Sequence, residues 1–257
     1  KVVANYAVGY NNIDVDAASE RGVLVTNTPG VLTETTADLT WALLMSIARR
    51  IVEGDSFMRA GKYVGWAPML LLGSDVYGKT LGIVGIGQIG QAVARRAMGF
   101  DMKILYCDMF ALPPVAERLL NAEKVELDEL LERSDYVSLH VPLMDETHHL
   151  IGKRELELIG SDGYLINASR GPVIDEVALV EALRDGVIKG AALDVFEDEP
   201  EMKPGLADLE NVVLLPHLGS ASIETRTGMA ELAVGNILNF FKGEAPLSPV
   251  NPDVLKG

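Results

Sequence analysis

The chain has 257 residues, of which 48% are hydrophobic, and its formal net charge is −15. This composition predicts one large or two ordinary folded domains, and the acidic excess opposes binding to nucleic acid or to an anionic membrane, because both require positive patches. The single cysteine, Cys107, excludes an intrachain disulfide and favours a reducing, cytoplasmic location, and no apolar run reaches membrane-spanning length.

The opening residues, "KVVANYAVGY", have the pattern of a strand and carry no initiator methionine. Because a domain seldom starts inside a core strand, we expect the natural protein to begin further upstream. A long helix is predicted over residues 33–54, where Thr33 or Thr35 would cap the start and Gly54 follows the end.

From residue 80 onward, short apolar runs alternate with helical patterns. Strands are predicted over residues 80–87, 103–108, 136–142, 163–169, 190–196 and 211–216, and helices over residues 88–100, 127–135, 153–160 and 175–186. This alternation predicts an α/β fold with a doubly wound parallel sheet, covered by helices on both faces. A second long helix is predicted over residues 222–243, and the Pro-rich tail 245–257 is either a loose end or packs in extended form.

The segment "GIVGIGQIG" places Gly85, Gly87 and Gly90 in the G-x-G-x-x-G spacing. A lone match of this kind is weak, but here it follows a predicted strand and opens a predicted helix, as the dinucleotide fingerprint requires. The first glycine permits the tight turn, the second lets the backbone approach the pyrophosphate, and the third allows close helix–strand packing. The loop residues Gln88 and Ile89 would contact the phosphates through their backbone amides.

An acidic residue ends the next predicted strand. Asp108 lies 18 residues after Gly90, where its carboxylate can accept hydrogen bonds from the adenosine ribose hydroxyls. The same carboxylate would repel a 2′-phosphate, and Met109 and Phe110 follow where an NADP site would call for arginine. The sequence therefore favours NAD over NADP.

Polar residues with complementary chemistry follow three later strands. Arg170 comes after "YLINAS", Asp194 and the acidic cluster with Glu199 come after "GAAL", and His217 comes after "VVLLP". In an open parallel sheet, ligands bind beyond the carboxyl ends of the strands. Arginine can hold a carboxylate, histidine suits proton transfer, and a carboxylate beside an imidazole orients the ring and favours its protonated form. Near a nicotinamide, this set describes hydride transfer at a carbon next to a carboxylate.

No metal site is predicted. His140, His148 and His149 lack the helical spacing of metal ligands and have no cysteine cluster nearby, so we interpret them as strand-end and surface residues. A G-x-S-x-G segment typical of α/β-hydrolases is absent from the sequence.

The sequence resembles the D-2-hydroxyacid dehydrogenase family, and most closely its glyoxylate/hydroxypyruvate reductase branch. The resemblance rests on "LGIVGIGQIGQAVA", "LINASRGPVIDEVALVEAL", "GAALDVFEDEP" and "LLPHLGSAS", and it extends over essentially the whole chain. It implies that Arg170 binds the substrate carboxylate, that His217 is the general acid/base, and that Glu199 is the partner of His217. Formate dehydrogenases of this family carry Gln in place of that Glu, so Glu199 argues against that activity.

The resemblance also implies further binding residues. Asp194 would face the nicotinamide carboxamide, and the backbone amides of Val8 and Gly9 would hold the substrate carboxylate. The NAD cleft would further be lined by Thr36, Val141, Pro142, Ala168, Ser169 and Gly219. Trp66 resembles an aromatic residue that some relatives insert into the partner subunit's site, and a homodimer through the cofactor domain, involving residues 37–70, is implied.

By the same resemblance, residues 1–28 are the remnant of a flavodoxin-like substrate domain, residues 29–218 form the NAD-binding domain, and the helix and tail of residues 219–257 return to the substrate domain. The predicted activity is the NADH-dependent reduction of a small 2-oxo acid. Two alternatives remain open at this stage: an incomplete NAD-binding module without activity, and a corepressor-like NAD sensor.

Overall fold

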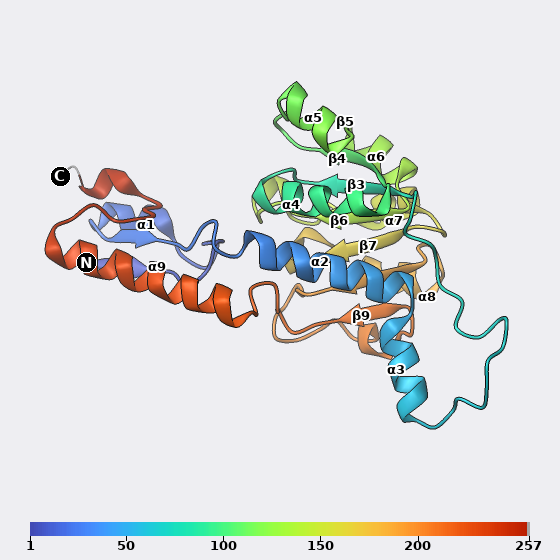
Figure 1. Ribbon diagram of the computed structural model, residues 1–257. Helices are drawn as coiled ribbons and strands as arrows, with labels where there is room; N and C mark the ends of the chain where they lie inside the picture. Colours follow the sequence, from blue (N-terminus) through green and yellow to red (C-terminus); the bar gives the residue numbers. More distant parts are fainter. Residues whose placement is uncertain (256–257) are drawn as a thin grey trace. The chain divides into compact units, whose positions relative to one another are not determined.

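The structure, a computed structural model, describes residues 1–255, and a seven-stranded parallel sheet is the core of its larger unit (Figure 1). The strands are β3 (Thr80–Val84), β4 (Lys103–Cys107), β5 (Ala122–Lys124), β6 (Tyr136–Leu139), β7 (Tyr164–Asn167), β8 (Gly190–Leu193) and β9 (Val212–Leu214). Their spatial order is β5-β4-β3-β6-β7-β8-β9, so the chain leaves β3 on one side and returns to its other side with β6. This arrangement confirms the predicted doubly wound α/β fold.

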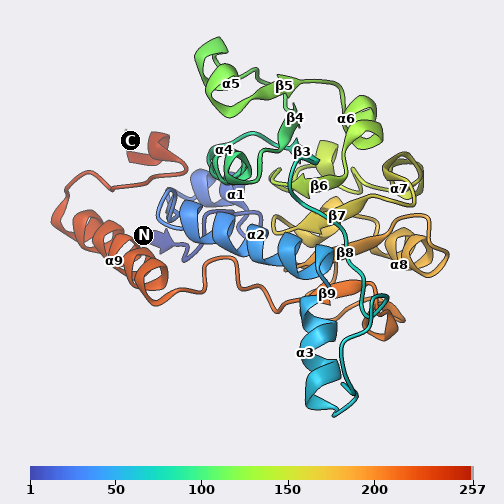
Figure 2. The same cartoon turned by 45° about the vertical axis from the view of Figure 1, so that its right-hand side comes forward.

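Helices cover both faces of this sheet, as Figure 2 shows. They are α2 (Thr33–Ala48), α4 (Gln88–Ala97), α5 (Pro114–Leu120), α6 (Leu127–Arg133), α7 (Lys153–Ile159) and α8 (Glu176–Arg184). Helix α3 (Ile51–Arg59) has no buried residue and projects away from the sheet. Side chains alternate between the faces: Leu81 and Ile83 pack in the cluster formed with α2 and α4, whereas Val84 packs in the cluster formed with α6, α7 and α8.

The predicted single helix over residues 33–54 is wrong, because the chain breaks between α2 and α3. Arg50 has a left-handed backbone (φ 52°), and α3 begins at the next residue. The Ser74 backbone amide donates to the Ala48 carbonyl (2.7 Å), so a later segment of the chain takes the acceptor at the end of α2. The sequence analysis also missed α5 and β5, which lie at the edge of the sheet.

A smaller unit consists of residues 1–36 and residues from 220 onward. It contains the parallel strands β1 (Val2–Ala4) and β2 (Leu24–Thr26) with α1 (Val15–Glu20) and α9 (Ile223–Lys242). The tail is not a loose end: the Val250 amide donates to the Val25 carbonyl (2.8 Å), and the Asn251 side chain accepts from the Val25 amide (2.7 Å). The predicted extended form does not hold for Pro252–Leu255, which is a short 3-10 helix.

The larger unit comprises residues 37–219. The sequence analysis placed the first boundary after residue 28, whereas the structure groups residues 29–36 with the smaller unit. A hydrogen bond between the Thr35 and Thr225 hydroxyls (2.5 Å) is one reason for this grouping. Within residues 1–255, no helix combines the length and the apolar character needed to cross a bilayer.

Candidate functional site

Each glycine of the G-x-G-x-x-G segment occupies a position that a side chain would disturb or a ligand could use. Gly85 follows β3 with φ +93°, and a Cβ there would lie 2.7 Å from the His140 carbonyl carbon. A Cβ on Gly90 would lie 2.2 Å from the Gly85 carbonyl oxygen, so this glycine permits α4 to approach the loop. At Gly87, the residue before α4, a Cβ would meet nothing within 4 Å. The open side of Gly87 at a helix N-terminus fits the approach of a pyrophosphate.

Asp108 ties the end of β4 to this glycine loop. Its Oδ2 accepts from the Ile86 amide (2.8 Å), and its Oδ1 accepts from the Phe110 amide (3.0 Å). Each carboxylate oxygen can accept a second hydrogen bond. The half-buried carboxylate therefore lies beside the loop with remaining acceptor capacity, as a ribose-binding residue requires.

A carboxylate–imidazole pair lies beyond β8 and β9. His217 Nδ1 is 2.9 Å from Glu199 Oε2, and Glu199 Oε1 accepts from the Phe196 amide (3.1 Å). The Glu199 side chain is 37% exposed and the His217 side chain 52% exposed, so the pair is open to a ligand. Because Nδ1 faces the carboxylate, Nε2 is the ring atom that can exchange a proton with a ligand.

Arg170 follows β7 and lies near this pair. Burial lowers the pKa of the Arg170 guanidinium, and the nearby Glu199 charge acts in the opposite direction. The Arg170 guanidinium also donates to the Ser169 carbonyl (2.7 Å). The carboxyl edge of the sheet thus carries the glycine loop together with Arg170, Glu199 and His217. The guanidinium of Arg170 can bind a carboxylate, and the imidazole of His217 can deliver a proton.

Asp194 is 1% exposed and holds the segment that carries His217. Its Oδ1 accepts from the Leu218 amide (2.6 Å) and its Oδ2 from the Gly219 amide (2.7 Å). The Asp194 carbonyl also accepts from the His217 amide (2.9 Å). Burial raises the pKa of the Asp194 carboxyl, and the two backbone hydrogen bonds lower it. The strand-end position of Asp194 is predictable from the sequence, whereas these backbone contacts are not.

Asn167 was missed by sequence reasoning, although it shapes the turn before Arg170. It is 1% exposed, its Oδ1 accepts from the Ser169 amide (3.0 Å) and hydroxyl (2.7 Å), and its Nδ2 donates to the Arg170 carbonyl (2.9 Å). The signal available in the sequence was an asparagine at a strand end before a turn, a position where its side chain commonly bonds the following backbone.

The remaining predicted cleft residues follow strands of the same sheet or belong to the smaller unit. Val141 and Pro142 come after β6, and Ala168 and Ser169 come after β7. Val8, Gly9 and Thr36 belong to the smaller unit, where the Val8 carbonyl accepts from Asn27 Nδ2 (2.8 Å) and the Gly9 carbonyl from Asn5 Nδ2 (2.8 Å). Their roles toward substrate and cofactor stay predictions.

The histidines outside the pair differ in setting. Burial lowers the pKa of His140, just after β6, to about 4, and its Nε2 lies 2.8 Å from the Ser138 hydroxyl. The prediction that His149 is a surface residue is wrong in part: it is half-buried, and its Nε2 lies 3.1 Å from Glu197 Oε1. Among residues 1–255, no group of three or more metal-ligating side chains is assembled.

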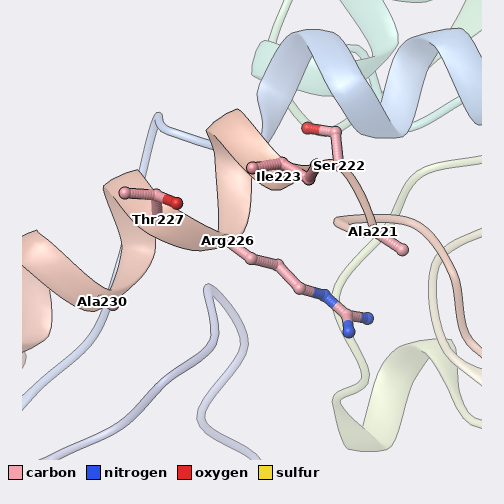
Figure 3. A pocket seen from close by; sticks show the side chains of 6 residues that line it. All are labelled: Ala221, Ser222, Ile223, Arg226, Thr227 and Ala230. Atoms are coloured by element: carbon pink, nitrogen blue, oxygen red, sulfur yellow. The ribbon is translucent and has the colours of Figure 1, made fainter.

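An open hollow of about 570 Å³ lies at the start of α9 in the smaller unit (Figure 3). Its lining residues are Ala221, Ser222, Ile223, Arg226, Thr227 and Ala230. None of the predicted site residues is among them, so this hollow is not the site described above.

Comparisons with known proteins agree with this geometry. Residues 41–219 match the family described as "D-isomer specific 2-hydroxyacid dehydrogenase, NAD binding domain". The chain is 55% identical to a protein named glyoxylate reductase from Thermococcus litoralis, over 99% of this chain and 78% of that protein.

Solved structures are similar over comparable lengths. A protein from Thermus thermophilus matches with a TM-score of 0.92 and 49% identity, over 97% of this chain and 78% of that one. The NADPH-dependent glyoxylate/hydroxypyruvate reductase of Sinorhizobium meliloti, solved with NADP and malonate, matches with a TM-score of 0.89 and 38% identity, over 97% of this chain and 77% of that one. The family match over residues 41–219, the identity to these relatives and the shared fold show that the chain belongs to the D-isomer specific 2-hydroxyacid dehydrogenase family and contains its NAD-binding domain.

Proposed function

We propose that this protein reduces a small 2-oxo acid, glyoxylate or hydroxypyruvate, to the corresponding 2-hydroxy acid with a nicotinamide cofactor. The observation that carries the proposal is the 2.9 Å contact between His217 Nδ1 and Glu199 Oε2, with Arg170 nearby and the glycine loop on the same sheet edge. The choice of substrate is supported by the names of the Thermococcus litoralis and Sinorhizobium meliloti proteins.

Three side chains carry the proposed chemistry. The Arg170 guanidinium binds the substrate carboxylate and polarises the adjacent carbonyl. His217 Nε2 donates a proton to the carbonyl oxygen during reduction, and Glu199 orients the imidazole through its contact with Nδ1. The bound nicotinamide supplies the hydride. The amides of Val8 and Gly9 complete the carboxylate site, and Asp194 faces the carboxamide of the cofactor.

The test is an absorbance assay of NADH oxidation with glyoxylate, hydroxypyruvate and pyruvate. Turnover with the first two is expected, and replacing His217 by Asn should lower kcat by at least about 100-fold while NADH binding persists, because only the proton transfer is removed. NADH binding by a folded wild-type protein without turnover of any of the three acids would instead support a binding module or an NAD sensor.

We further propose NADH as the preferred cofactor, because the Asp108 carboxylate lies beside the glycine loop and would repel a 2′-phosphate. The NADPH-dependent Sinorhizobium meliloti protein makes the direct comparison necessary. We expect a higher kcat/KM with NADH than with NADPH, and the reverse order would contradict the assignment.

We also propose a cytoplasmic location, with which the single cysteine is consistent.

A homodimer through the cofactor domain is also proposed. Helix α3 contains no buried residue, and the segment after it exposes large apolar side chains, among them Val64 (99% exposed), Trp66 (83%) and Met69 (76%). Exposed apolar surface of this kind commonly marks an interface. Analytical ultracentrifugation should show a dimer that the double variant Val64→Ser/Trp66→Ser weakens, whereas Leu119→Ser on the exposed face of α5 leaves it intact.

A further inference from the structure

A buried carboxylate outside the proposed catalytic set holds the loop that carries Glu199. Glu176 is the first residue of α8 and is only 3% exposed. Its Oε2 accepts from the Glu197 amide (2.8 Å), and its Oε1 accepts from the Lys203 amide (2.8 Å). A charged group this buried is costly unless hydrogen bonds compensate for the lost water. Here both oxygens are satisfied by the backbone of one loop.

Glu199 lies between these two anchored amides. Within residues 196–203, the Phe196 amide donates to Glu199 Oε1 (3.1 Å), and the Glu201 amide donates to the Asp198 carbonyl (2.9 Å). The other oxygen of Glu199 faces His217 Nδ1. The anchors at residues 197 and 203 therefore set the position of the carboxylate that orients the imidazole.

A second contact joins this loop to the segment of Arg170. At Gly171, the residue after Arg170, a Cβ would lie 1.8 Å from the Phe196 carbonyl oxygen. The Phe196 backbone, at the start of the loop, therefore packs directly against the Gly171 backbone in the turn that follows β7. The loop is fixed against the Arg170 turn at residue 196 and against α8 at residues 197 and 203.

The polar side chains around Glu176 belong to the same loop and to one histidine. Glu197 Oε2 accepts from the Glu176 amide (3.3 Å), and Glu197 Oε1 lies 3.1 Å from His149 Nε2. Lys203 Nζ lies 3.8 Å from Glu197 and 2.5 Å from Asp198, and the Asp198 contact raises the pKa of Lys203. The Lys203 ammonium offsets part of the negative charge of Glu197 and Asp198. The carboxylate of Glu176 itself is held by the two backbone amides of the loop.

We propose that Glu176 is a positioning residue for the Glu199–His217 pair: its carboxylate fixes both ends of the loop 197–203 and thereby holds Glu199 against the imidazole. The inference rests on the proposed acid–base role of that pair. Acidic residues in the first turn of a helix also stabilise it through the helix dipole, but that role requires no contact with the loop.

Glu176→Gln tests the inference, with Glu181→Gln, an exposed glutamate on the same helix, as the matched control. A glutamine keeps the shape but turns an NH₂ group toward one of the two amides. Because small displacements of catalytic groups cost up to about 100-fold in rate, we expect kcat to fall about 10- to 100-fold in Glu176→Gln and to stay near the wild-type value in Glu181→Gln. The same loss of kcat is expected in Glu199→Gln, because both variants disturb the orientation of the imidazole.

Two further measurements separate positioning from a general loss of structure. In a Glu199→Gln background, adding Glu176→Gln should lower kcat by less than about threefold, because both changes act on one unit. Hydrogen exchange of the amides at 197 and 203 should accelerate in Glu176→Gln and not in Glu181→Gln. If Glu176→Gln does not fold, Glu176→Asp, which is shorter by one methylene and keeps the charge, is carried through the same measurements.

Unchanged exchange at residues 197 and 203 would overturn the anchoring. Faster exchange with an unchanged kcat would overturn the positioning role, as would full additivity with Glu199→Gln. Failure of the proposed function is seen separately, in the wild-type protein, as the absence of turnover with every 2-oxo acid before any variant is compared.

Discussion

His217 has a left-handed backbone conformation (φ 53°), which is uncommon for a residue with a side chain. Such a conformation costs on the order of 1–3 kcal/mol and persists only where neighbouring contacts determine it. Asp194 supplies those contacts, because its carbonyl and its carboxylate accept the amides of three successive residues, from His217 to Gly219. The position of the imidazole is therefore set by a buried residue 23 positions earlier in the chain.

Asp194→Asn should destabilise the protein and displace His217. A carboxamide presents an acceptor to only one of the Leu218 and Gly219 amides and a donor to the other, so one buried donor loses its partner at a cost of about 1–3 kcal/mol. Urea unfolding at pH 7 measures this loss, and kcat/KM should fall with it. Asp208→Asn, at an exposed position, is the control, and an equal stability of the two variants would contradict the role of Asp194.

His140 makes stability depend on pH between about 4 and 6.5. Its pKa is about 4 in the folded protein, against 6.5 for a free histidine, so the unfolded chain binds a proton in this range that the folded protein excludes. Stability is therefore lost as the pH falls below 6.5, by about 1.5 kcal/mol between pH 6.5 and pH 5. The free energy of unfolding, measured against pH for the wild type and for His140→Asn, should differ by this slope. Parallel curves would show that His140 is not the group responsible.

At the scale of single residues, the sequence predicts side chains whose chemistry is visible in the pattern. Arg170 and His217 stand out because each follows an apolar strand, and parallel strands end at one edge. Asn167 and Glu176 were not predicted as site residues, because their partners are backbone amides that no residue pattern reveals. The roles of the predicted residues toward substrate and cofactor await the experiments above.

At the scale of elements, the strand–loop–helix unit from β3 to α4 contains one glycine required for packing and one open to a ligand. A Cβ at Gly90 would lie 2.2 Å from the Gly85 carbonyl oxygen, whereas a Cβ at Gly87 would meet nothing within 4 Å. Gly87 also has a negative φ (−65°), which alanine adopts without strain. Gly90 is therefore needed for the packing of α4 against the loop, whereas Gly87 leaves space for a ligand, although both belong to one motif.

Gly87→Ala should fold as the wild type does and bind NADH at least about tenfold more weakly, because the methyl group occupies space proposed for the pyrophosphate. Gly90→Ala should lose stability, since the helix must move away from the loop to relieve the collision. Thermal unfolding and NADH titration by calorimetry distinguish the two. Equal NADH affinity in Gly87→Ala and the wild type would argue that the cofactor does not approach this glycine.

Elements with strong local patterns were predicted, and those set by distant contacts were not. The buried central strands read as near-continuous apolar runs, as expected for a parallel sheet covered on both faces. The edge strand β5 reads "AEK" and carries no such pattern. The break between α2 and α3 depends on Ser74, whose amide takes the Ala48 carbonyl from 26 residues away, and helical periodicity contains no information about that contact.

On the scale of the whole molecule, each of the two units contains residues to which the proposed function assigns ligand binding. The catalytic set and the glycine loop belong to residues 37–219, whereas Val8, Gly9 and Thr36 belong to residues 1–36. The chain passes between the units at residues 36–37 and 219–220, so segments from both ends of the sequence build the smaller unit. In the proposed function, ligand binding by the larger unit and ligand binding by Val8 and Gly9 of the smaller unit can therefore be tested separately.

Hydrogen exchange with successive ligands tests that separation. NADH alone, at about 100 times its dissociation constant, should stabilise the folded protein by about 2.7 kcal/mol and slow exchange around the glycine loop, Asp108 and Gly219. Adding oxamate, an unreactive analogue of a 2-oxo acid, should then slow exchange at the Val8 and Gly9 amides, because their N–H groups bind the carboxylate in the proposed site. The segment around Glu123, at the far edge of the sheet in β5, serves as the internal control. Protection at Val8 and Gly9 that is independent of oxamate would remove these residues from the substrate site and leave Arg170 as the carboxylate-binding group.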